Sequence, residues 1–132
     1  MHDLPRRTSL VVSAERSSSR SARAAVHDLC RYAAMSVDAA EVAVLLVSEL
    51  VTNAHQHAGG PAVVDVVVDD RSLRVAVADD DPTLPTQRDA APYDERGRGL
   101  MLVDALASRW GATRADGGKS VWFELDRARP LP

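Results

Sequence analysis

Cysteine occurs only once in this sequence, as Cys30, and one cysteine can form neither an intramolecular disulfide nor a cysteine-rich metal site. The first residues carry no apolar segment after their charges. No stretch approaches the roughly 18 consecutive apolar residues of a membrane span. We therefore expect neither export nor membrane insertion, and we expect the protein to work in the cytoplasm.

An excess of positive charge is also missing, because the formal net charge is −3. A nucleic-acid-binding protein normally needs a basic face that releases counterions. Arginines do gather near the N-terminus, but such a cluster is more often a solvated arm or helix face than a site. The composition therefore argues against direct binding to nucleic acid.

The bulk composition is that of a folded globular protein. The 132 residues are 45% hydrophobic and 27% charged, which is enough apolar material for one core and lies within the usual size of one domain. We therefore predict a single domain over residues 1–132.

Hydrophobic periodicity and turn signals predict helices and strands in a mixed order. The predicted elements are a strand at 9–13, helices at about 17–34 and 38–58, strands at 62–68 and 73–78, a helix at about 99–108, and strands at 110–114 and 120–125. Asp38 is the predicted N-cap of the second helix, and Gly59 ends it. This order predicts an α+β two-layer sandwich, with helices on one face of a mostly antiparallel mixed sheet.

A long loop is predicted at residues 79–98, because three prolines interrupt it and no periodicity is sustained. Irregular connections of this length are uncommon inside a compact domain, and they are often lids over active sites. The loop therefore raises the expectation of a bound ligand.

Three groups of residues are candidates for a site. Glu49, Asn53 and His57 recur every four residues and share one side of the second helix. Asp79 to Asp81 stand at the end of an apolar strand, where a carboxylate can accept from an amine or bind a metal. Gly97 and Gly99 precede a helix, where backbone N–H groups can bind phosphate. Taken singly, these groups are also explained by a solvent-facing helix side, an acidic turn and a tight turn.

The order of the motifs is more specific than any one of them. The segment 48–54 followed by His57 resembles the N box of the ATPase superfamily of gyrase, the ninety-kilodalton heat-shock chaperones, histidine kinases and the mismatch-repair ATPases, known as GHKL. Asp79 stands where the first glycine box of that superfamily begins, and the segment 97–100 resembles the second glycine box. The segment 117–121 resembles the turn and strand that close the site. Within the superfamily, the short chain and the segment 99–107 look most like anti-sigma-factor serine/threonine kinases.

This resemblance implies a Bergerat-type fold that binds ATP and Mg2+, with a lid at about 80–98. It implies that Asn53 coordinates magnesium, that Glu49 is the general base for a serine hydroxyl, and that Asp79 recognises the adenine amine. The other residues that it places at the nucleotide are His57, Asp81, Gly97, Arg98, Gly99, Leu100 and Ser120. The implied partners are a sigma factor and an anti-anti-sigma (antagonist) protein that receives the phosphate, and a homodimer is a further expectation.

The sequence departs from the family pattern at two motifs. Asp81 and Thr83 stand where the first glycine box has glycines, and Lys119 stands where threonine is common, with Ser120 beside it as a substitute. An added carboxylate near a nucleotide is unfavourable unless magnesium or Arg98 offsets it. ATP binding is therefore better supported than phosphoryl transfer. The alternative to a kinase is a regulatory module that binds proteins without turnover.

Overall fold

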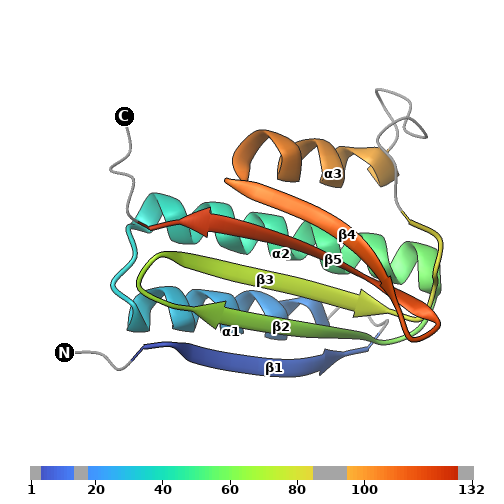
Figure 1. Ribbon diagram of the computed structural model, residues 1–132, viewed down its shortest axis with the longest axis horizontal. Helices are drawn as coiled ribbons and strands as arrows, with labels where there is room; N and C mark the ends of the chain where they lie inside the picture. The colour runs from blue at the N-terminus through green and yellow to red at the C-terminus, as the bar shows by residue number, and fades with distance from the viewer. Residues whose placement is uncertain (1–3, 14–17, 85–94, 128–132) are drawn as a thin grey trace.

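The computed structural model describes residues 4–13, 18–84 and 95–127 (Figure 1). Its elements, in chain order, are β1 (Arg6–Val12), α1 (Ser18–Tyr32), α2 (Val37–Ala58), β2 (Ala62–Val68), β3 (Ser72–Asp79), α3 (Glu95–Leu106), β4 (Arg109–Ala115) and β5 (Gly118–Asp126). Residues 1–3, 14–17, 85–94 and 128–132 lie outside the description. Most of the predicted lid is among them.

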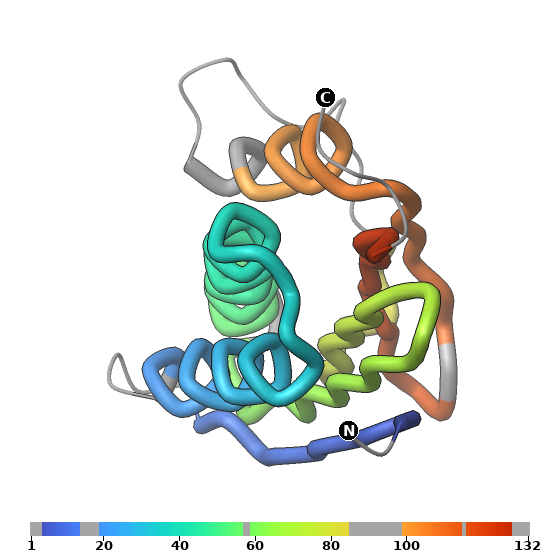
Figure 2. The backbone as a smooth tube through the Cα atoms, turned by 90° about the vertical axis from the view of Figure 1, so that its left-hand side faces the viewer, coloured from blue at the N-terminus to red at the C-terminus, as the bar shows by residue number. Residues whose placement is uncertain are grey.

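The strands form one five-stranded sheet in the order β1-β2-β3-β5-β4, and every neighbouring pair is antiparallel. All three helices lie on the same side of the curved sheet (Figure 2). α1 and α2 contact the sheet and each other, and α3 lies along α2 toward β4. The predicted α+β two-layer sandwich is confirmed.

The core follows from strict alternation along the central strands. Inward-facing residues such as Val64, Val66, Val75 and Val77 are buried, while their neighbours in the sequence are more exposed. Phe123 of β5 is fully buried against them. Burial of each such side chain contributes about 1.5–3 kcal/mol, so packing of the helices on this face provides most of the stabilisation.

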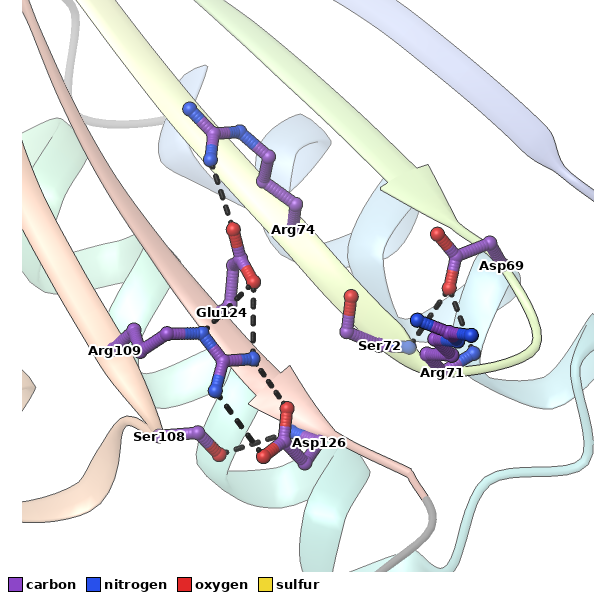
Figure 3. A network of polar contacts seen from close by, with 8 residues as sticks. All are labelled: Asp69, Arg71, Ser72, Arg74, Ser108, Arg109, Glu124 and Asp126. Atoms are coloured by element: carbon purple, nitrogen blue, oxygen red, sulfur yellow. Dashed lines mark hydrogen bonds and ion pairs between the residues drawn. The ribbon is translucent and has the colours of Figure 1, made fainter.

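The opposite face of the sheet carries a network of charges at one end (Figure 3). Arg74 Nη1 donates to Glu124 Oε1 at 2.9 Å, and Arg109 Nη2 donates to Glu124 Oε2 at 3.1 Å. Arg109 also pairs with Asp126, whose backbone N–H donates to Ser108 Oγ at 2.9 Å. These pairs place charged groups over that end of the open face of β3, β4 and β5.

β1 begins at Arg6, three residues before the predicted start. The apolar pattern of the sequence gives no indication of this start, because residues such as Arg7 are polar. Arg7 nevertheless lies opposite Val67, and it donates twice to Asp65 of β2, at 2.8 and 2.6 Å. Cross-strand pairing therefore continues the strand beyond its apolar part.

The prediction that Asp38 caps α2 is wrong. The helix begins at Val37, and Ser36 is its N-cap, since Ser36 Oγ accepts the N–H of Ala39 at 3.1 Å. Asp38 lies in the first turn, where a negative charge is still favourable. The predicted end is right: Gly59 adopts φ of 69° and donates its N–H to His55 O at 3.0 Å.

The prediction that a loop runs to Arg98 and that a helix follows Gly99 is also wrong. α3 already begins at Glu95, so Gly97 and Gly99 lie within its first two turns and not before it. Glycine usually marks a turn in a sequence, but inside a helix it also allows close approach of another element. No helix among the described residues is long and apolar enough to cross a membrane.

Candidate functional site

Four elements that are distant in the sequence meet at one small pocket. The lining residues are Leu50, Asn53 and Ala54 of α2, Val77 and Asp79 of β3, Leu100 of α3, and Lys119 and Val121 of β5. The pocket has a volume of about 10 Å³, which is at most the space for one water molecule. Asn53, Asp79 and Leu100 therefore share one pocket, but that pocket has no room for a base.

An ion pair between Asp79 and Lys119 closes this pocket. The two residues lie directly opposite each other in the β3–β5 register. Lys119 Nζ is 3.0 Å from each carboxylate oxygen of Asp79, and the two side chains are only 3% and 2% exposed. Lys119 Nζ also donates to Asp81 O at 3.1 Å. An ammonium group has three N–H donors, so this buried cation is well satisfied where it lies.

The segment after Asp79 is a turn held by its own carboxylates. The N–H of Asp81 donates to Asp79 Oδ1 at 2.9 Å, and the N–H of Thr83 donates to Asp81 Oδ1 at 2.9 Å. Asp and Asn side chains often organise turns in this way. Arg114 of β4 adds a hydrogen bond from Nε to Pro82 O at 3.0 Å. Two side-chain turns thus occupy the place of the first glycine box.

α3 packs directly on the polar side of α2. A Cβ added at Gly99 would lie 3.0 Å from Asn53 Nδ2 and 3.3 Å from Glu49 Oε2. Glu49 and Asn53 are both half-buried. They therefore face the beginning of α3, and the explanation of this ridge as a fully solvent-facing helix side does not hold for these two residues.

The other predicted site residues are distributed differently. Leu100 is buried in the pocket, whereas Gly97 and Arg98 are described only as backbone in the first turn of α3. The side chain of His57 lies outside the description. Ser120 pairs with Ala78 and Thr113, and alternation along β5 directs it to the sheet face opposite the helices. The structure thus does not bring Ser120 to the pocket.

Gly118 fixes the start of β5 against the end of β3. A Cβ at this position would lie 1.9 Å from Asp79 O, which no side chain could tolerate. The backbone of β5 therefore approaches Asp79 more closely than any other residue type allows. This approach places the next residue, Lys119, beside the Asp79 carboxylate.

Sequence reasoning noticed Lys119 only as a departure from the family pattern. A stronger signal was present in the alternation of β5, because Lys119, Val121, Phe123 and Leu125 recur every second residue and must share a face. A lysine at an inward position needs a buried partner. Asp79 occupies the same inward face of β3, so the pair follows once the two strands are aligned.

A larger groove of about 740 Å³ lies elsewhere, between α1 and α2. Its lining is mostly apolar and includes Met35, Val44 and Leu45, with Arg23 and Arg31 on the α1 side. None of the predicted site residues lines it. Among the described residues, no three His, Cys, Asp or Glu side chains are gathered as a metal site.

Comparison with known sequences identifies the family. A sequence model described as "Histidine kinase-like ATPase domain" matches residues 12–125. The chain belongs to this family. A relative that is 39% identical over 80 residues is an uncharacterised protein of Streptomyces coelicolor, and the match covers 58% of this chain and 76% of that protein. The family predicted from the N box and glycine boxes is thus confirmed.

Two solved structures have a similar fold. The structure of the RsbU and RsbW domains of Rv1364c from Mycobacterium tuberculosis matches with a TM-score of 0.73 at 20% identity, covering 95% of this chain and 33% of that one. The SiaB–SiaC complex from Pseudomonas aeruginosa matches with a TM-score of 0.66 at 12% identity, covering 90% and 88%. The chain spans about a third of the Rv1364c structure, and at these identities the likeness establishes the fold.

Proposed function

We propose that this protein is an ATP-binding regulator of the anti-sigma-factor kinase type. The observation that carries the proposal is that Asn53 of α2 and Asp79 of β3 line the same pocket, in a domain of the histidine kinase-like ATPase family. Leu100 of α3 closes that pocket from a third element. The polar groups that would hold a nucleotide are therefore together, although the space for the base is closed in this conformation.

The residues around the pocket suit distinct roles toward ATP. Asn53 would hold Mg2+ together with the nucleotide phosphates, because its side-chain oxygen is a ligand that magnesium accepts. Glu49 would act as general base and orient a serine hydroxyl. ATP would supply the phosphoryl group that this serine receives. The partners in this proposal are a sigma factor, which the protein binds, and an anti-anti-sigma protein, which carries the serine.

A second candidate function is a regulatory module that binds its partners without phosphoryl transfer. It is favoured by the Asp79–Lys119 ion pair and by the carboxylate turns that stand where the family has glycines. Both features hold the end of β3 in one arrangement. In this case the ATPase fold would serve as a scaffold for partner contact.

Calorimetric titration with ATP and Mg2+ tests the first proposal. We expect measurable binding by the wild type and at least a roughly tenfold weaker Kd for Asn53→Ala, because one magnesium ligand is lost. Thr52→Ala is the matched control, since Thr52 is on the exposed side of the same helix turn. Absence of binding by the wild type at millimolar nucleotide would refute the ATP-binding proposal.

Phosphate transfer separates the two candidates. With radiolabelled ATP and an anti-anti-sigma protein as acceptor, we expect the wild type to label the acceptor and Glu49→Ala to lose transfer while keeping its ATP affinity. If the wild type binds the anti-anti-sigma protein without labelling it, the result would favour the regulatory module that acts without phosphoryl transfer.

A further inference from the structure

We propose that Lys119 controls access of the nucleotide to this site, because its ammonium group occupies the place at Asp79 where the adenine amine would bind. The inference rests on the proposed ATP binding and adds a residue that determines affinity. The base can reach Asp79 only after the Lys119 side chain has left the pocket.

The hydrogen bonds of Asp79 carry this inference. Asp79 Oδ1 accepts from Lys119 Nζ at 3.0 Å and from the N–H of Asp81 at 2.9 Å, and Lys119 Nζ lies 3.0 Å from Oδ2 as well. This carboxylate is only 2% exposed, so a further donor can reach it only if a neighbouring group is displaced. The adenine amine and the ammonium group therefore compete for the same oxygens.

The volume of the pocket leads to the same conclusion. Its volume of about 10 Å³ lies between Leu50, Leu100 and Val121, with Lys119 on its wall. A purine needs far more space than one water molecule, so binding requires movement of a lining group. Lys119 has the longest and most flexible side chain in the wall, whose other members are apolar core residues together with Asn53 and Asp79.

The side chain of Lys119 can rotate while the backbone of β5 stays in place. Gly118 holds the β5 backbone against Asp79 O, with a hypothetical Cβ at 1.9 Å, and β5 is paired on both sides along its length. Rotation of this one side chain, with loss of its hydrogen bonds to Asp79 and Asp81, would therefore open the pocket beside Asp79. No described strand has to separate.

Substitution of Lys119 tests the proposal by affinity. Lys119→Thr removes the competing ammonium group. The loss of hydrogen bonds to a charged group corresponds to roughly a tenfold to hundredfold change in Kd. We expect ATP to bind at least tenfold more tightly to Lys119→Thr than to the wild type. Thr113→Ser is the matched control, because Thr113 pairs with Ser120 from the neighbouring strand and is exposed, and its Kd should equal that of the wild type.

Amine labelling of the wild type provides a test that needs no variant. Lys119 is the only lysine in the sequence, so acetylation by an N-hydroxysuccinimide ester can be followed at one peptide by mass spectrometry. We expect Lys119 to react at least tenfold more slowly than an added lysine peptide, and to react several times faster when ATP and Mg2+ are present. This measurement remains valid if Lys119→Thr, which leaves Asp79 without its partner, does not fold.

The outcomes separate this inference from the proposed function. If ATP binds the wild type and Lys119→Thr equally well, or if bound ATP leaves the labelling of Lys119 unchanged, the role of Lys119 is refuted and ATP binding stands. If neither protein binds ATP at millimolar concentration, both proposals fall. Tighter binding by Lys119→Thr together with faster labelling of the wild type supports both.

Discussion

At the scale of single residues, the environment of Cys30 determines its chemistry. Cys30 is fully buried in α1, and this burial raises the pKa of its thiol from 9.0 to about 11, partly offset by the positive charge of Arg127. The thiolate is the form that reacts with disulfides and alkylating agents. Cys30 is therefore a core residue, and its thiol is protected in the folded state.

We predict that Cys30 does not react with a thiol reagent at pH 8 until the protein unfolds. Because the folded pKa is higher than the unfolded one, the stabilisation from Cys30 is complete below about pH 9 and is lost as pH rises through about 11. The difference in free energy of unfolding between the wild type and Cys30→Ala should narrow by up to roughly 2–3 kcal/mol over that range. Urea unfolding at several pH values measures it, and a difference independent of pH would contradict the prediction.

The resemblance to a known order of motifs pointed to several residues of the candidate site. Glu49, Asn53 and Asp79 were recognisable because their spacing along a helix and at a strand end follows a known order of motifs. The pairing of Asp79 with Lys119 depends on which strands are neighbours, and the sequence does not state that β5 lies next to β3. The closed state of the pocket therefore required the structure.

At the scale of elements, α2 shows how a cap and a charge in the first turn differ. Ser36 accepts a backbone N–H, whereas Asp38 interacts with the helix through its charge. We predict that Ser36→Ala lowers the free energy of unfolding by about 1 kcal/mol, and that Asp38→Asn lowers it by less than about 0.5 kcal/mol in high salt. Chemical denaturation of both variants in 0.5 M salt tests this, and a loss of less than about 0.5 kcal/mol for Ser36→Ala would contradict the assignment of Ser36 as the cap.

Elements with strong alternation were predicted best. β2 and the end of α2 were predicted with their observed bounds, and β3 nearly so, because apolar periodicity and the Gly59 stop signal agree with the structure there. The start of α3 was missed because two glycines and the nearby prolines indicate a loop when the local sequence is considered alone. Contact of Gly99 with Glu49 and Asn53 explains why glycine is compatible with that helix. Such tertiary contact has no signal in the local sequence.

At the scale of the whole molecule, two layers must be joined at their ends as well as through the core. Arg127, directly after β5, makes such a connection. Its Nη1 donates to Asp69 O at 2.5 Å, and its Nη2 donates to Ala33 O at 2.5 Å. The first carbonyl belongs to the turn between β2 and β3, and the second follows α1. One guanidinium group thus links the sheet layer to the helix layer, at the end of the sheet away from Asp79.

We predict that Arg127→Ala lowers the free energy of unfolding by about 1.5–3 kcal/mol, because two carbonyls lose a charged donor. Arg127→Lys is the matched control: it keeps the charge, but an ammonium group cannot bridge both carbonyls with the geometry of a guanidinium, so its loss should be intermediate. Loss of the positive charge in Arg127→Ala should also raise the pKa of Cys30 further, whereas Arg127→Lys should leave it nearly unchanged. Thermal unfolding together with thiol titration distinguishes the two effects. Equal stability of all three proteins would mean that the core alone holds the layers together.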